Sequence, residues 1–110
     1  MLQTVRQLTQ FNKKEIDYLF EHARCLYKDA ALTLLCAPQQ QSFGRALIIT
    51  PRTIGNAPQR NKIRRQLKAI FYQEKLYEKG VDCAFIIRKP LLKKSFQELR
   101  ALCVQTFSTL

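Results

Sequence analysis

The sequence predicts an α/β (α+β) fold of the two-layer sandwich type, in which helices pack on a small mixed sheet. Three amphipathic helical patterns and three short apolar runs follow one another in the order α-β-β-α-β-α. With 110 residues and 46% hydrophobic content, the chain can build one modest core, so we expect a single domain over residues 1–110. The helix between the second and third strands requires a crossover, which indicates that part of the sheet is parallel.

The first helix is predicted over residues 13–24. Asn12 is a good N-cap residue, and Glu15 three positions later completes a capping box. Apolar residues then recur at helical spacing: Ile16, Leu19, Phe20 and Ala23. Residues 1–10 show only weak patterning, and we expect them to form a flexible or loosely docked arm.

Three apolar runs are predicted to be strands: residues 31–36, 45–50 and 81–87. The third run is apolar except for Asp82, which is typical of a strand buried on both faces. Residues 38–44, between the first two runs, are polar and contain turn-forming residues. We therefore predict a hairpin connection there.

The second and third helices are predicted over residues 58–78 and 95–107. The turn Gly55-Asn56-Ala57-Pro58 suits a helix start because proline is tolerated in the first turn, and Lys79-Gly80 is a good C-terminal signal. Ser95 begins a second capping box, closed by the glutamate three residues later.

The charge of the chain is strongly unbalanced. Its net charge is +11, with a pI of about 9.9. Residues 45–68 contain seven cations and no acid: Arg45, Arg52, Arg60, Lys62, Arg64, Arg65 and Lys68. Charge that served solubility alone would be spread along the chain, so this concentration indicates a binding surface for a polyanion.

The second predicted helix has two different faces. Arg60, Arg64 and Lys68 fall on one line at i, i+4 spacing, with Asn61 and Arg65 beside it, and the apolar residues Ile63, Leu67 and Ile70 fall on the far side. One face therefore packs on a core, and the other faces an anion.

RNA is the polyanion that these features favour. A membrane-binding helix would add bulky apolar residues for lipid, and a helix-turn-helix would place a second short helix before the basic one. Because the strand and loop before the basic helix do not fit a helix-turn-helix, we expect no DNA partner. The chain has no run of about 18 apolar residues and no signal-peptide region, so we expect no membrane partner and a cytoplasmic location. A helix N-terminus, several arginines and an amide suit RNA phosphates.

Catalysis by protein side chains has little support. His22 is the only histidine, and Glu15 and Glu74 lie on separate helices with no sign that they converge. The cysteines lack paired metal-ligand spacing and are expected to be reduced residues in or beside the core: Cys25, Cys36, Cys83 and Cys103. We expect no catalytic residue and no metal site in the protein.

The basic segment resembles a known signature. Arg60-Asn61-Lys62-Ile63-Arg64-Arg65, preceded by Ile54-Gly55-Asn56-Ala57, is similar to the arginine-rich signature of the bacterial ribonuclease P protein component. The similarity covers most of the chain and includes Leu19-Phe20 and the segment Ile86-Ile87-Arg88-Lys89-Pro90. The resemblance implies a subunit of an endoribonuclease that hydrolyses precursor tRNA, releasing the 5′ leader and leaving a 5′-phosphomonoester. It implies that a catalytic RNA and its bound Mg²⁺ carry the chemistry.

The resemblance also assigns residues. The implied RNA-binding residues are Arg52, Arg60, Asn61, Lys62, Arg64, Arg65 and Lys68, and the implied cleft for the 5′ leader contains Ile16, Phe20, Leu32 and Leu34. Ile16 and Leu34 stand where aromatic residues are usual in the family. The family's β-α-β crossover is left-handed, and we expect the same here against the general right-handed rule.

Two alternatives remain. Another small RNA-binding protein of ribosomal type, without a nuclease role, would share the charge pattern. An independent nuclease that uses protein carboxylates and a metal would need at least two convergent acids, yet the chain has only eight acids and the basic segment has none.

Overall fold

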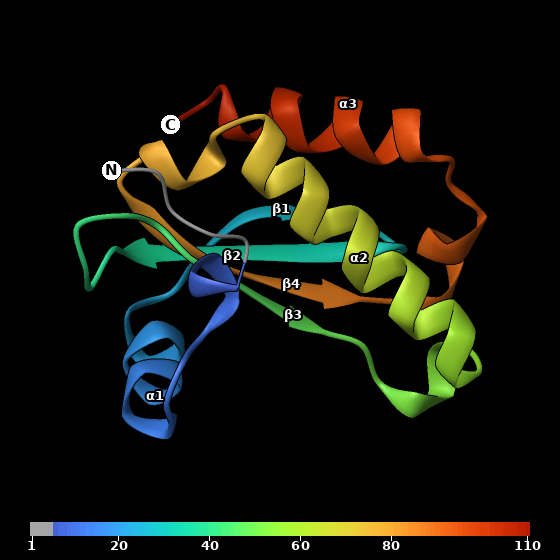
Figure 1. Cartoon of the computed structure of the whole chain (residues 1–110), viewed down its shortest axis with the longest axis horizontal. Helices are drawn as coiled ribbons and strands as arrows, with labels where there is room; N and C mark the ends of the chain where they lie inside the picture. The colour runs from blue at the N-terminus through green and yellow to red at the C-terminus, as the bar shows by residue number, and fades with distance from the viewer. Residues whose placement is uncertain (1–5) are drawn as a thin grey trace.

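Four strands form one mixed sheet in the computed structural model, which describes residues 6–110 (Figure 1). They are β1 (Arg24–Lys28), β2 (Leu32–Pro38), β3 (Ala46–Ile49) and β4 (Val81–Ile87), and their order across the sheet is β1-β2-β4-β3. β2 pairs antiparallel with β1 and β4, and β3 pairs parallel with β4. The predicted fold class and the partly parallel sheet are thus confirmed.

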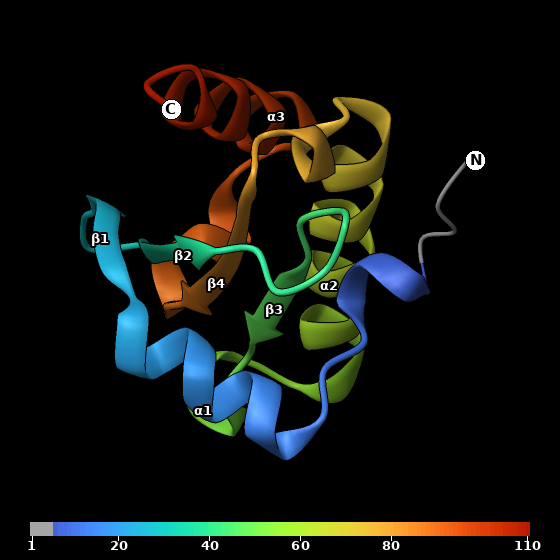
Figure 2. The same ribbon diagram turned by 90° about the vertical axis from the view of Figure 1, so that its left-hand side faces the viewer.

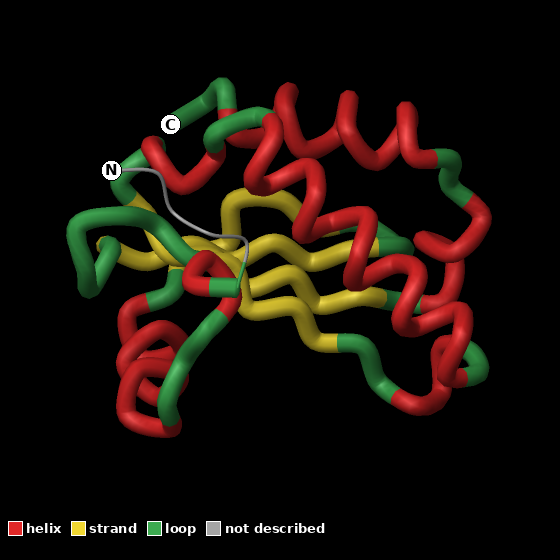
Figure 3. The backbone as a smooth tube through the Cα atoms, in the orientation of Figure 1, coloured by secondary structure: helices red, strands yellow, loops and turns green. Residues whose placement is uncertain are grey.

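Three α-helices flank the sheet: α1 (Lys13–His22), α2 (Ala57–Gln73) and α3 (Phe96–Phe107). Figures 1 and 2 show α2 and α3 on one face and α1 on the other, and Figure 3 shows the loops that join them. The predicted capping boxes at Asn12 and Ser95 are both present. No helix within residues 6–110 is long and apolar enough to cross a membrane.

Two details of the predicted topology were wrong. The sequence analysis missed β1. A bulge between Cys25 and Tyr27 interrupts the alternation of its side chains, so the strand shows no regular polar and apolar pattern. The predicted hairpin over residues 38–44 does not form, since β4 lies between β2 and β3 and pairs with both. That pairing joins strands more than thirty residues apart and leaves no local trace in the sequence.

The crossover from β3 through α2 to β4 is left-handed, as expected from the resemblance. In Figure 2 the parallel strands point away from the viewer, and the chain runs counterclockwise from β3 over α2 to β4. This arrangement is an exception to the usual right-handed rule. It places α2 on the face of the sheet that α3 also covers (Figures 1 and 2).

Helix α2 ends five residues earlier than predicted. Lys75 adopts a left-handed conformation with φ of 53°, and a 3₁₀ turn, η3 (Leu76–Glu78), follows it. The change of direction lets Leu76 and Tyr77 turn into the core, where both are buried. Burial of these two side chains therefore overrides the helical pattern that the sequence shows up to residue 78.

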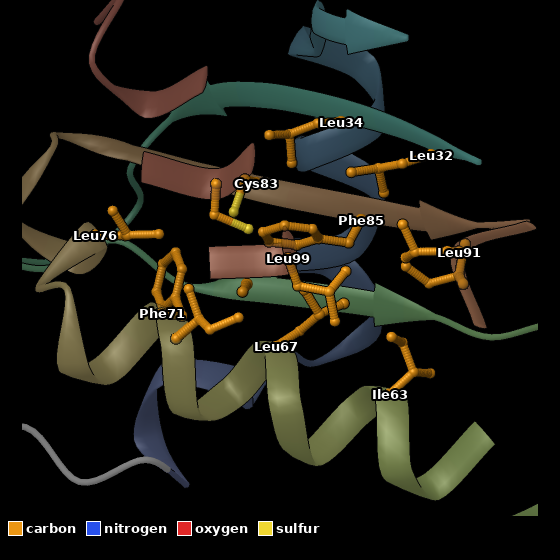
Figure 4. Packing of buried hydrophobic residues seen from close by; sticks show 14 of the residues in the cluster. Leu32, Leu34, Ile63, Leu67, Phe71, Leu76, Cys83, Phe85, Leu91 and Leu99 are labelled. Carbon is orange, nitrogen blue, oxygen red and sulfur yellow. The ribbon is translucent and has the colours of Figure 1, made fainter. Parts of the chain in front are cut away.

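The main core lies between the sheet and the pair α2 and α3 (Figure 4). Phe85 of β4 stacks on Phe107 of α3 with ring centroids 6.4 Å apart, and Phe71 of α2 meets the same ring edge-on at 6.2 Å. Cys36, Cys83 and Cys103 are buried and free, whereas Cys25 is exposed, which confirms the expectation of reduced core or edge cysteines.

A smaller apolar cluster lies on the opposite face, under α1. It contains Leu19, Ala37 and Ala84, with Leu35 and Leu47 packed at its edge. Leu19 is the only fully buried residue of α1. The apolar contact of this helix with the sheet is therefore small.

The segment before α1 is docked in its described part. Leu8, in the 3₁₀ turn η1 (Gln7–Thr9), is 1% exposed and belongs to the main core. This burial contradicts the expected loose arm for residues 6–10. Residues 1–5 of the predicted arm lie outside the described residues.

Candidate nucleic-acid interface

Helix α2 begins at a tightly built turn. The Asn56 side chain accepts a hydrogen bond from the Gln59 amide at 2.9 Å, and the Gln59 side chain accepts one from the Asn56 amide at the same distance. A Cβ atom on Gly55 would lie 2.5 Å from Gln59 Oε1 and 3.0 Å from Leu92 Cδ1. Glycine at position 55 therefore allows the turn to pack against the segment after β4.

The cations of α2 form a continuous flank, as the sequence predicts. We use the name arginine flank for four of these cations and the asparagine between them: Arg60, Asn61, Arg64, Arg65 and Lys68. Ile63, Leu67 and Ile70 on the opposite side are at most 3% exposed and pack in the core. The helical spacing in the sequence thus predicted the buried face of α2 correctly. Contact between the flank and RNA stays a prediction.

No carboxylate of the described residues neutralises this flank. None of the ion pairs found within residues 6–110 involves a residue of α2's basic half. Arg60 Nε is buried and has no hydrogen-bond partner in the described part of the chain. The Arg64 guanidinium donates a hydrogen bond to Asn61 Oδ1. The guanidinium groups of these side chains and the positive end of the helix dipole would both favour an anionic ligand.

A second group of cations, which the sequence analysis missed, adjoins α2. The segment after β4 contains Arg88, Lys89, Lys93 and Lys94, and its middle forms the 3₁₀ helix η4 (Lys89–Lys93). Lys94 and Leu92 line a cavity of about 170 Å³ together with Gln59, Lys62 and Gln66 of α2. Lys62 therefore faces the segment that contains η4, beside the arginine flank.

The signal for η4 was present in the sequence. Residues 88–94 hold four cations and no acid. Their placement beside the start of α2 depends on β4 running through the middle of the sheet. Arg52, in the 3₁₀ turn η2 (Arg52–Ile54), is exposed and lies in the loop that leads into α2.

Arg45 does not belong to the binding surface, although the sequence analysis counted it among the seven cations. The residue is 1% exposed. It forms ion pairs with Glu15 at 3.0 Å and with Asp82 at 3.5 Å. A charge in this position is buried and paired, and cannot reach an RNA phosphate.

Leu32 and Leu34 were assigned to the leader cleft wrongly. Both are 1% exposed and belong to the main core under α2 and α3, on the face away from α1. Side chains alternate along a strand, so the α1-side face of β2 carries Thr33 and Leu35 instead. Leu32 and Leu34 therefore cannot line a cleft on the α1 side of the sheet.

The α1-side face keeps an accessible part beyond the helix. The register pairs Thr33 with Ile86 and Ile49 with Ile86, which places these three residues on one row of that face. Ile49 and Ile86 are half-buried, and Arg88 Nη1 donates a hydrogen bond to Thr33 Oγ1. On α1, Ile16 is half-buried and Phe20 is 41% exposed.

The acidic residues and the histidine that the sequence analysis considered lie in separate surroundings. No group of three or more His, Cys, Asp or Glu side chains that could hold a metal occurs within residues 6–110. Glu74 pairs with Arg100 at 2.8 Å. The backbone amide of Asn12 and the nearby guanidinium of Arg45 lower the pKa of Glu15, which keeps this carboxylate ionised. His22 is exposed and stacks on Tyr18.

Comparisons with known proteins agree with the fold and the signature. The family model described as Ribonuclease P matches residues 6–110. A protein named "Ribonuclease P protein component" from Roseiflexus sp. (strain RS-1) is 35% identical over 80 residues, which cover 70% of this chain and 66% of that protein. The match thus spans just under two thirds of that relative's length.

Two solved structures are similar to the chain over most of its length. The RNase P protein from Thermotoga maritima has a TM-score of 0.77 at 20% identity, with 93% of this chain and 96% of that chain covered. The Staphylococcus aureus RNase P protein also has a TM-score of 0.77, at 15% identity, with 93% and 94% covered. At these identities the similarity shows the fold alone.

Proposed function

The chain belongs to the ribonuclease P protein family, and on this basis we propose that it is the protein subunit of a ribonuclease P holoenzyme. In this proposal, it binds a catalytic RNA and the 5′ leader of precursor tRNA. The holoenzyme cleaves one phosphodiester bond, releases the leader and leaves a 5′-phosphomonoester on the mature tRNA. We place this reaction in the cytoplasm.

The observation that carries the proposal is the unneutralised arginine flank on α2. Within the described chain, no acid pairs with Arg60, Arg64 or Arg65. Such cations repel one another until an anion binds, and an RNA backbone offers phosphates in a row. Arginine is suited to this role because its planar guanidinium can donate two parallel hydrogen bonds to one phosphate.

We propose that RNA contacts extend from the arginine flank to Arg52, Lys62 and the η4 cations. Lys62 and Lys94 line the same cavity between α2 and η4. A basic surface that continues from α2 to the segment after β4 could hold phosphates of two neighbouring RNA segments. This arrangement would bury the first turns of α2 in the catalytic RNA.

The leader would bind elsewhere, on the α1-side face. Phe20 is an exposed aromatic side chain, and aromatic rings bind single-stranded nucleic acid by stacking on its bases. Arg88, held by Thr33, supplies a cation next to the half-buried Ile86. We therefore replace Leu32 and Leu34 of the predicted cleft by Thr33, Ile86 and Arg88, and keep Ile16 and Phe20.

The protein would assist the chemistry without carrying it out. The acids within residues 6–110 do not converge into a set that fits Mg²⁺, so we propose that the RNA holds the Mg²⁺ of the reaction. Protein cations that neutralise phosphates reduce the repulsion between the catalytic RNA and its substrate. Less Mg²⁺ is then needed to bring the two RNAs together.

A ribosomal-type RNA-binding protein without a nuclease partner is not favoured. It would share the charge of α2, but it gives no reason for the match of the family model to residues 6–110.

Binding to RNA tests the proposal. The affinity of the protein for the catalytic RNA of its own organism should be measured against an unrelated structured RNA of equal length, at one fixed salt concentration. We expect clear preference for the catalytic RNA. Equal affinity for both RNAs would leave only nonspecific polyanion binding and would contradict the proposal.

A further inference from the structure

Arg45 is a buried cation that joins the start of β3 to the segment around α1. Its Nη1 donates a hydrogen bond to the backbone oxygen of Gln10 at 2.7 Å and lies 3.0 Å from Glu15 Oε2 on α1. The guanidinium also sits over the Phe11 ring, 4.2 Å from its centroid. One side chain thus contacts three residues in and just before α1.

Asp82 of β4 holds Arg45 from the sheet side. Asp82 Oδ1 accepts a hydrogen bond from the Arg45 amide at 2.9 Å, and Oδ2 lies 3.5 Å from Nη2. Asp82 is 0% exposed. The carboxylate therefore holds the Arg45 backbone by a hydrogen bond and lies near its guanidinium, whose Nη2 makes no hydrogen bond within the described residues.

Two glutamines complete the polar contacts of α1 with the body of the protein. Gln40 Nε2 donates to the Glu15 carbonyl at 3.0 Å and to Asp82 Oδ2 at 3.4 Å. Gln41 Nε2 donates to Glu15 Oε2 at 3.3 Å. We call the set Arg45, Glu15, Asp82, Gln40 and Gln41 the Arg45 network.

The Arg45 network is the more directional of the two attachments of α1. The apolar attachment consists of one fully buried residue of α1, Leu19, on a small cluster. Hydrophobic contact of this size fixes burial but permits sliding, whereas ion pairs and hydrogen bonds have defined directions. The polar contacts that the network makes with α1 all reach Glu15 in its first turn, and the exposed Phe20 lies in its last turn.

We propose that Arg45 is a positioning residue that holds α1 at a fixed place on the sheet. It thereby orients Phe20 so that this side chain can bind the 5′ leader of the precursor. The part that concerns the leader rests on the proposed function. Arg45 touches neither RNA nor the reacting atoms. Its effect passes through Glu15 to the orientation of α1.

Glu15→Gln is the gentlest test of the Arg45 network. Glutamine at this position can still close the capping box with Asn12, and Arg45 keeps its partner Asp82, so the fold should persist. Arg45→Met is the stronger variant, and Arg45→Lys tests whether a charge without the guanidinium fork restores function. Glu74→Gln is the matched control because it removes an ion pair with Arg100 that is remote from α1.

The measurement uses the reconstituted holoenzyme and compares precursor tRNA with mature tRNA. For Glu15→Gln and Arg45→Met we expect the affinity ratio of precursor to mature tRNA to fall about fivefold or more, the lower end of the effect of losing one stacked base. Affinity for the catalytic RNA should be unchanged. Amide hydrogen exchange of α1 should become faster, while that of α2 stays the same. Arg45→Lys should restore only part of the ratio.

Two results would overturn the proposal. Unchanged amide exchange in α1 for both variants would show that the network does not hold the helix. Faster exchange with an unchanged affinity ratio would show that α1's position has no influence on the leader. If the unaltered protein itself shows no preference for precursor tRNA, the leader part of the proposed function fails, and amide exchange still decides whether Arg45 holds α1.

Discussion

Arg64 donates a hydrogen bond from its guanidinium to the side-chain oxygen of Asn61, three residues earlier on α2. Both side chains belong to the arginine flank, on the side of α2 that faces away from the core. The bond reduces the freedom of a long side chain before any ligand binds. A phosphate that Arg64 contacts therefore costs less side-chain entropy than it would at an unrestrained arginine.

Removal of arginines from this flank should reduce both RNA affinity and its dependence on salt. For Arg64→Ala and Arg65→Ala we expect the slope of log K against log salt to fall by roughly 0.7–0.9 for each phosphate that the variant no longer neutralises. The slope is measured by titrating the catalytic RNA with protein at several salt concentrations. Lys79→Ala, at an exposed position beyond the C-terminal end of α2, is the control and should keep the slope. An unchanged slope in the arginine variants would place their side chains away from phosphate.

The η4 segment should add to the same binding surface. Lys89→Gln and Lys93→Gln together remove two exposed cations beside the start of α2 without touching its core. We expect weaker binding to the catalytic RNA and a smaller salt slope, by the same physical reasoning. RNA affinity equal to that of the unaltered protein would restrict the interface to α2.

Phe20 should act on the leader rather than on the catalytic RNA. Loss of one aromatic platform costs about 1–3 kcal/mol per stacked base, so Phe20→Ala should weaken binding of precursor tRNA and leave mature tRNA unaffected. Val104→Ala removes an exposed apolar side chain of α3, on the other face of the sheet, and serves as control. A loss of similar size for both tRNAs would mean that Phe20 does not contact the leader.

The cysteines should differ sharply in reactivity. Burial raises the pKa of the Cys103 thiol to about 12 and that of Cys83 well above its ordinary value. Cys36 is buried as well, whereas Cys25 is exposed on the edge strand β1. Since the thiolate is the reactive form, an aromatic disulfide reagent near neutral pH should modify only Cys25 in the folded protein. Modification of more than one thiol before unfolding would contradict the buried positions.

The features that the sequence predicted best are those set by neighbouring residues. The capping boxes of Asn12 and Ser95 and the buried stripe Ile63, Leu67 and Ile70 follow from short-range spacing, and all are present. The left-handed crossover came from the family resemblance, because no local pattern encodes handedness.

The errors arose where distant segments meet. β4 separates β2 from β3, so the expected hairpin could not form. Leu34 was placed on the wrong face because alternation fixes only relative orientation, and a shift of one residue exchanges the two faces. Arg45 was counted as a surface cation because its partners Glu15 and Asp82 are far away in sequence.

The most direct test of the account is cleavage of precursor tRNA by the catalytic RNA of the same organism at low Mg²⁺. Three reactions are compared: the RNA alone, the protein alone, and both together. We predict that the protein alone cleaves nothing, that the RNA alone cleaves slowly, and that the two together cleave much faster at the same bond. Absence of stimulation at every Mg²⁺ concentration, or cleavage by the protein alone, would contradict the account.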